Sequence, residues 1–163
     1  MHIFLAELRR VETTLRVCYY LAELFTKLRN QLPLLEQVKK SYSGDKCLLQ
    51  GVVQRLRAMG FRVEELYYQK EREQAITLSV RVWPHQSAEW VRRVETLNRF
   101  TIYFSHGMKR VLHTILEAEH QGFCYYNYKW HSRRLFSAVV ARLRHLALFV
   151  SHNRDSCIRV QWW

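Results

Sequence analysis

The chain has 163 residues, of which 48% are apolar and 13% aromatic, and it carries 26 Lys and Arg against 14 Asp and Glu, a formal net charge of +12. This length is typical of one domain, so a single domain over residues 1–163 is expected, and the apolar fraction excludes a disordered tail. With only five Gly and two Pro, the composition also argues against a loop-rich or all-β fold.

The N-terminal segment predicts a long amphipathic helix. Its apolar residues recur at helical intervals, and Pro33 then interrupts or kinks the pattern. The predicted stripe contains Ile3, Leu8, Val11, Leu15, Cys18, Ala22, Phe25 and Leu28 or Arg29, and it is widened by Leu5, Leu21, Leu24 and Leu32. Leu34, Leu35 and Val38 can extend it.

A turn over 41–45 then supplies Ser43 or Asp45 as the cap of a second helix. This helix has apolar residues from 48 to 59 and Gly60 as its stop.

The middle of the chain predicts two strands and then two helices. Residues 61–68 are short and aromatic, residues 76–82 alternate apolar and polar side chains, and the polar run 69–74 can join them as a hairpin. Ser87 is the expected cap of a helix from Ala88, in which Val91, Val94 and Leu97 keep helical spacing. Gly107 predicts a break or kink between about residues 104 and 107, and the helix that follows should stop at Gly122.

The C-terminal part predicts an aromatic loop over 123–130, a last helix and a strand. The helix has a buried face from Leu135 to Val150, and the tail 158–163 alternates like a strand that can pair with one of the earlier two. The expected fold class is therefore α+β and mainly helical, with about five helices and a small two- or three-stranded antiparallel sheet.

The basic excess is concentrated in the second half of the chain. Residues 1–80 carry 13 Lys and Arg against 9 Asp and Glu, a net charge of +4, whereas residues 81–163 carry 13 against 5, a net charge of +8. A surplus of this size weakens a compact state through self-repulsion, and a polyanionic partner, most commonly nucleic acid, is its simplest explanation. The second half is therefore where an anion-binding face is expected.

Basic and aromatic residues over 123–144, with further cations from 92 to 110, form the candidate nucleic-acid interface. Guanidinium and ammonium groups neutralise phosphates, and aromatic rings stack on exposed bases. The alternative is a solvated basic helix face with the aromatic rings packed in the core. The candidate residues are Arg92, Arg93, Arg99, Lys109, Arg110, Tyr126, Tyr128, Lys129, Trp130, Arg133, Arg134, Arg142 and Arg144.

The pattern of histidines is weaker evidence for a metal site. His106, His113 and His120 are seven residues apart, and Glu117 falls on the same helix face, so two imidazoles and a carboxylate come within reach of one ion. Such spacing is usually incidental, and no metal or other cofactor is expected. Nucleophile elbows, P-loops and dinucleotide fingerprints are also missing from the sequence, which predicts no catalytic residue and no enzymatic activity.

The cysteines and the N-terminus indicate a cytoplasmic protein. The four cysteines, Cys18, Cys47, Cys124 and Cys157, are far apart and form no CxxC pair, so free thiols in a reducing compartment are expected. Glu7, Arg9 and Arg10 would lie inside the apolar core that a signal peptide requires. No apolar run approaches the ~18 residues of a membrane span, so no membrane partner is expected.

Residues 99–123 resemble part of the AcaB-like regulator family of integrating conjugative elements and conjugative plasmids. The similar features are Tyr103, the run Arg110-Val111-Leu112 and the compact pattern from Leu116 to Phe123, and the strand 76–83 with Pro84 stands before them in a similar order. The resemblance implies a cytoplasmic bacterial DNA-binding protein that regulates transcription of transfer genes. In that case, His120 and Gly122 are structural residues at a helix end.

The sequence thus predicts a nucleic-acid-binding protein, favouring duplex DNA over RNA, in a regulatory or accessory role on a mobile element. Two other functions stay open: a small helical subunit of a ribonucleoprotein or defence complex that lines a nucleic-acid channel, and a protein-interaction module with an acidic partner. A homodimer and a place in a larger complex also stay open.

Overall fold

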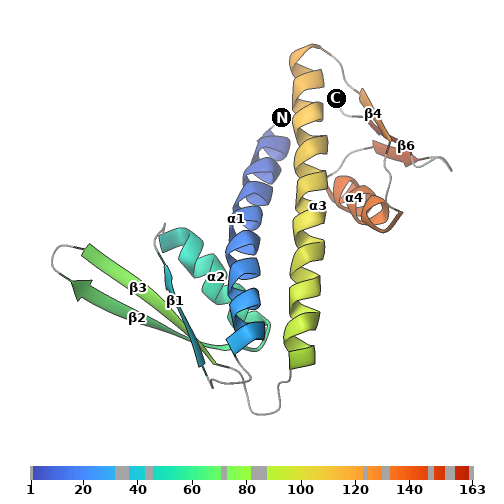
Figure 1. Cartoon of the computed structure of the whole chain (residues 1–163). Coiled ribbons are helices and arrows are strands. Elements are labelled where there is room, and N and C mark those ends of the chain that lie inside the picture. Colours follow the sequence, from blue (N-terminus) through green and yellow to red (C-terminus); the bar gives the residue numbers. More distant parts are fainter. Residues whose placement is uncertain are drawn as a thin grey trace. The chain divides into compact units, whose positions relative to one another are not determined.

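The computed structural model describes residues 2–31, 37–42, 46–70, 73–81, 88–122, 125–129, 133–146, 149–152 and 157–161, some of them by their backbone alone. These residues form four helices and six strands (Figure 1). In chain order they are α1 (His2–Gln31), β1 (Gln37–Tyr42), α2 (Lys46–Ala58), β2 (Arg62–Lys70), β3 (Glu73–Arg81), α3 (Ala88–His120), β4 (Tyr125–Lys129), α4 (Arg133–His145), β5 (Phe149–His152) and β6 (Cys157–Gln161). The expected mainly helical α+β class is confirmed.

Packing divides the chain into two compact units, which are described separately. The central unit is Arg16–Thr101, and the terminal unit combines Met1–Leu15 with Ile102–Trp163. Each unit contains one half of α1, one half of α3, one shorter helix and one three-stranded sheet. The single domain expected from the chain length stays a prediction.

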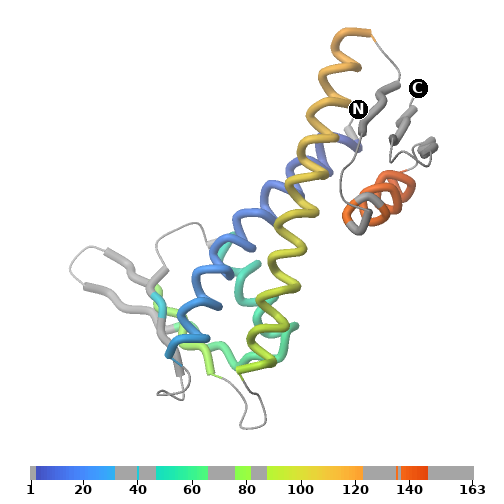
Figure 2. Tube along the Cα trace, turned by 45° about the vertical axis from the view of Figure 1, so that its right-hand side comes forward, coloured from blue at the N-terminus to red at the C-terminus, as the bar shows by residue number. Residues whose placement is uncertain are grey.

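The core of the central unit lies between helices and the antiparallel sheet β1-β3-β2. Strands β2 and β3 form the predicted hairpin, whose register places Val63 opposite Val80 and Tyr67 opposite Ile76. The coloured traces of α1 and α2 lie side by side in Figure 2. Helices α1 and α2 and the strands supply most of the buried side chains, namely Val17, Leu21, Leu24, Phe25, Leu28, Leu49, Val52, Val53, Leu56, Val63, Ile76, Leu78 and Val80. Phe61, between α2 and β2, is also buried there.

Helix α2 ends as the sequence predicts. Gly60 has a φ of 95°, a left-handed conformation that only glycine adopts without strain. Its amide donates to the carbonyl of Arg57, and the amide of Phe61 donates to the carbonyl of Leu56, both at 3.0 Å. This pair of bonds is a Schellman motif, which satisfies carbonyls at the end of a helix and turns the chain into β2.

Gly51 lets α2 approach α1 closely in the central unit. A Cβ atom built at Gly51 would lie 3.2 Å from Cγ2 of Val17, tighter than ordinary van der Waals contact. We expect Gly51→Leu to lower the free energy of unfolding by about 1–3 kcal/mol, because the added side chain overpacks this contact. Urea denaturation followed by circular dichroism measures the effect, with Gln50→Leu at the exposed neighbouring position as the control. Equal stabilities of the two variants would contradict the close approach.

The terminal unit has its own core and its own sheet. Apolar residues from α1, α3 and α4 pack together, namely Phe4, Leu8, Val11, Leu15, Met108, Val111, Leu112, Ile115, Val139, Val140 and Leu143. The sheet has the order β4-β6-β5, and both pairings are antiparallel. Most of the predicted N-terminal stripe is buried, namely Leu8, Val11, Leu15, Cys18, Leu21, Leu24, Phe25 and Leu28. Ala22 is only partly buried, Leu5 is exposed, and Phe4 is buried in place of Ile3, which is 54% exposed.

The predicted break near Gly107 is wrong, and it is the reason that the described residues form four helices instead of about five. Helix α3 runs without interruption from Ala88 to His120, and Gly107 is buried within it. A glycine inside a helix costs about 1 kcal/mol relative to alanine. Burial of Met108, Leu112 and Ile115 on the same helix outweighs that cost. Gly122 does end the helix, with a φ of 88°.

Three of the described strands lie where the sequence predicts a helix or a loop. Residues 37–42 form β1 rather than an extension of the first helix, the predicted loop 123–130 contains β4, and the last helix ends at His145, with β5 following at 149–152. The predicted C-terminal strand is present as β6, but it pairs with β4 and β5 and not with the hairpin. The expected caps Ser43, Asp45 and Ser87 and both prolines lie outside the described residues.

Candidate nucleic-acid interface

The first half of α3 presents a different face to solvent from the one that the sequence predicts. Leu97 was expected in the core but is 64% exposed, whereas Asn98 is 1% exposed and faces the core with Val91 and Val94. The Asn98 side-chain amide donates to the backbone carbonyl of Cys18 on α1, with an N–O distance of 2.9 Å. This bond offsets part of the cost of burying a polar side chain, although Asn98 Oδ1 is buried with no hydrogen-bond partner among the described residues. The same helix rotation leaves Leu97 in solvent.

The exposed face of α3 borders a hollow of about 440 Å³. The described residues that line it come from three successive helical turns, and we call them the α3 face: Glu89, Arg92, Arg93, Thr96 and Leu97. The spacing i, i+3, i+4, i+7 and i+8 brings these residues to one side of a helix. Two of the predicted site residues, Arg92 and Arg93, are therefore brought together.

Several of the predicted cations on α3 are bonded to carboxylates. Arg93 Nη2 lies 3.0 Å from Glu89 Oε1, and both side chains are about three-quarters exposed. Arg99 Nη2 lies 2.8 Å from Oε1 of the buried Glu95. Arg29 Nη1 lies 2.8 Å from the same oxygen, so one carboxylate holds two guanidinium groups in the central unit. An exposed ion pair such as Arg93–Glu89 stabilises a fold very little and leaves the arginine available to another anion.

The second half of α3 and helix α4 contribute the remaining described cations. Lys109 Nζ lies 3.7 Å from Glu12 Oε1, and both side chains are half-exposed. Arg110 and Arg144 are exposed. Tyr126, Tyr128 and Lys129 lie on β4, where they pair with β6, and Arg133 and Arg134 begin α4. The side chains of these last five residues, and the whole of Trp130, lie outside the described part of the chain.

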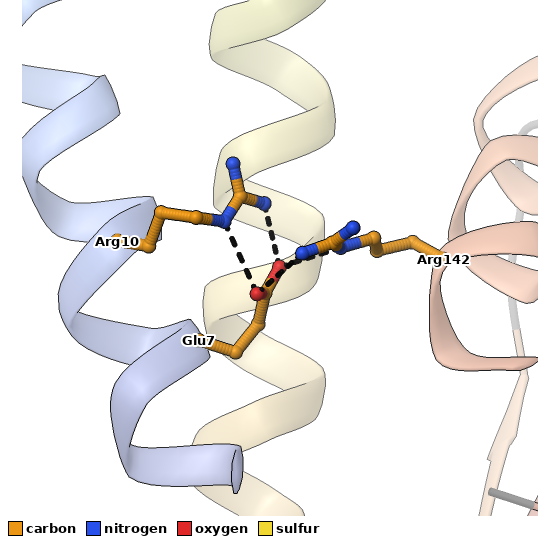
Figure 3. Close-up of polar contacts among 3 residues, drawn as sticks. All are labelled: Glu7, Arg10 and Arg142. Carbon is orange, nitrogen blue, oxygen red and sulfur yellow. Dashed lines mark hydrogen bonds and ion pairs between the residues drawn. The ribbon is translucent and has the colours of Figure 1, made fainter. Parts of the chain in front are cut away.

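Arg142 has a structural partner in the terminal unit. Its Nε and Nη2 donate to the two oxygens of Glu7 at 2.8 and 2.7 Å. Arg10 donates to the same two oxygens from the opposite side, at 3.1 and 2.6 Å (Figure 3). Glu7 is only 4% exposed, so its charge depends on this double clamp, which joins α1 to α4.

The two guanidinium groups change the acidity of Glu7. Hydrogen bonds from Arg142 lower its pKa most, burial opposes them, and Arg10 lowers the pKa further, with a net change from 4.5 to about 2. The carboxylate is therefore ionised at neutral pH although it is buried. Because Arg142 is committed to this contact, Arg142 is a poor position at which to test nucleic-acid binding.

The residues of the predicted histidine stripe lie along α3. His106, His113, Glu117 and His120 are all exposed along α3. Within the part of the chain that the structure describes, no group of three His, Cys, Asp or Glu side chains could hold a metal ion.

The described cysteines are thiols outside any disulfide. Cys47 is exposed and Cys18 is buried. Burial raises the pKa of the Cys18 thiol, and Arg55, whose Nη1 lies 3.2 Å from the sulfur atom, opposes that effect. The side chains of Cys124 and Cys157 lie outside the described residues.

None of the comparisons with known proteins found a match: no protein-family model, no curated protein and no solved structure matches the chain. Among the described residues, no helix is long and apolar enough to cross a membrane. The resemblance to AcaB-like regulators therefore stays an expectation from the sequence.

The sequence did not predict two features of these elements. One is Leu97, which helical spacing assigned to the core although Asn98 takes the core position. Residues 91, 94 and 98 have a spacing that fits a buried helix face as well as residues 91, 94 and 97 do. The sequence favoured Leu97 as the buried residue only because Asn98 is polar. The other is the contact between Glu7 and Arg142, which are 135 positions apart and carry no local signal of pairing.

Proposed function

We propose that the protein binds nucleic acid, mainly through contacts between its arginines and phosphate groups. The observation that carries this proposal is the surplus of 12 positive charges in 163 residues. Five of the candidate cations have exposed side chains on α3 and α4, namely Arg92, Arg93, Arg99, Arg110 and Arg144. Nucleic acid offers a regular array of anions that would compensate the self-repulsion of such a surface.

The ion pairs narrow the proposed interface rather than removing it. Arg142 and Arg99 are excluded, because each is bonded to a buried carboxylate, Glu7 and Glu95 respectively. Arg93 is retained, because its pair with Glu89 is exposed and a phosphate can replace the carboxylate at little cost. The resemblance to AcaB-like regulators supports the narrower proposal of a cytoplasmic DNA-binding regulator or accessory factor of a mobile element.

Binding should be steeply dependent on salt. If the protein neutralises six or more phosphates, affinity for a labelled oligonucleotide should fall by about a thousandfold or more between about 50 and 200 mM salt. Fluorescence anisotropy with duplex DNA, single-stranded DNA and RNA measures this dependence. Absence of binding to all three at low salt would refute the proposal.

The double charge reversal Arg110→Glu with Arg144→Glu tests the location of the interface. We expect it to weaken binding by about tenfold or more and to reduce the salt slope by about two, because each phosphate contact contributes about one to that slope. The control is the double variant Arg9→Glu with Arg16→Glu. Both arginines are exposed on α1, and this variant changes the net charge by the same amount. Equal losses in both double variants would show that net charge alone, and not this surface, determines affinity.

A further inference from the structure

We infer that the α3 face binds an unpaired nucleotide, so that the protein contacts single-stranded nucleic acid there. This inference rests on the proposed function and adds the class of nucleic acid that the face recognises. The face combines two neighbouring arginines with an apolar side chain that is 64% exposed, beside a hollow of about 440 Å³. All of the described residues that line the hollow lie on one side of α3, so the hollow is open to solvent.

The apolar part of the face consists of Thr96 and Leu97. The Thr96 hydroxyl donates to the backbone carbonyl of Arg92 with an O–O distance of 2.9 Å, so this bond already uses its proton. Thr96 therefore adds a methyl group next to the Leu97 side chain. A base pair inside a duplex keeps its flat apolar faces stacked on its neighbours, and only an unpaired base has a face free to cover such a surface.

The charged part of the face is one helical turn away. Arg92 and Arg93 precede Thr96 and Leu97 by four residues each, so each apolar group has a guanidinium one turn toward the N-terminus. A nucleotide has the same two parts, a flat base and a phosphate. Guanidinium groups bind phosphate with paired N–H donors, and their planes also stack on bases.

Glu89 limits the affinity of this face. Its carboxylate occupies Arg93 Nη2 at 3.0 Å and repels an approaching phosphate. Both side chains are about three-quarters exposed, so a phosphate can displace the carboxylate. Glu89 is the one acidic residue among the described residues that line the hollow. Neutralising its charge should therefore strengthen nucleotide binding.

The test compares three single variants on two probes, a labelled oligo-dT strand of about 15 nucleotides and a duplex of the same length. We expect Leu97→Ser to weaken oligo-dT binding by about 3–10-fold and to change duplex binding by less than about twofold. Arg92→Glu should weaken binding of both probes, and Glu89→Gln should strengthen oligo-dT binding by about 2–5-fold. Ile3→Ser, which removes a similarly exposed apolar side chain from α1, should change neither.

The outcomes separate this inference from the proposed function. Equal effects of Leu97→Ser on oligo-dT and duplex, or equal effects of Leu97→Ser and Ile3→Ser on oligo-dT, would overturn the inference and leave the proposed function standing. So would strong binding of oligo-dT that none of the α3-face variants changes, which would leave the face to another partner, such as an acidic peptide. No binding of either probe by the wild-type protein at low salt would overturn both.

Discussion

Replacement of Glu7 by Gln should lower the free energy of unfolding by about 3 kcal/mol at pH 7. The amide keeps the shape of the side chain but removes the charge that Arg10 and Arg142 clamp. The expected size follows from the pKa of Glu7, which is lowered from 4.5 to about 2 in the folded protein, because each unit corresponds to about 1.4 kcal/mol. Guanidinium chloride denaturation of both proteins measures the difference.

The same contact predicts a dependence on pH with a definite sign. The folded state holds the Glu7 proton less tightly than the unfolded state, so the stabilisation is complete above about pH 4.5 and is lost as the pH falls toward 2. The difference between wild type and Glu7→Gln should therefore shrink toward zero over that range. A difference that stays constant from pH 7 to pH 2 would show that the charge of Glu7 is not what stabilises the fold.

Glu89 provides the matched control for the Glu7 experiment. Glu89→Gln is the same chemical change in an ion pair whose two side chains are about three-quarters exposed. We expect a loss below about 0.5 kcal/mol, because solvent screens such pairs and they cost side-chain entropy to form. In a double-mutant cycle, Arg142→Leu should cost much less in the Glu7→Gln protein than in the wild type.

Replacement of Phe25 by Ala should lower the free energy of unfolding by about 3–5 kcal/mol. Phe25 is completely buried in the central unit, and its ring centroid lies 5.9 Å from that of Phe61. Phe61 in turn lies 4.5 Å from the ring of Trp90, so the truncation removes the first of three aromatic rings and leaves a cavity beside the other two. The helix propensity of alanine is high, so the loss reports packing and not a weakened helix.

Thr26→Ala on the next residue of α1 is the control for Phe25→Ala. Thr26 is exposed, and its hydroxyl donates to the backbone carbonyl of Ala22 within the same helix. We expect its removal to change the free energy of unfolding by less than about 0.5 kcal/mol. Urea denaturation followed by circular dichroism compares the two variants. A loss below about 1 kcal/mol for Phe25→Ala would contradict the described core.

Local patterns predicted the elements that depend on neighbouring residues. The alternation of residues 76–82 identified β3, and Gly60 and Gly122 marked the ends of α2 and α3, where both adopt a positive φ. Alternation, helical spacing and glycine stops are properties of a few consecutive residues, so they survive without knowledge of the rest of the chain. The same argument failed at Gly107, because burial of Met108 and Ile115 offsets the local preference for a break.

The amino-acid sequence by itself determined the net charge of +12, the mainly helical α+β class and the hairpin of β2 and β3. Only the tertiary structure decided that β6 pairs with β4, that Arg142 clamps Glu7, and that Asn98 is buried against Cys18 while Leu97 is exposed. The physical reason is the distance along the chain: charge, periodicity and turns act between near neighbours, whereas these contacts form between segments that meet only after folding.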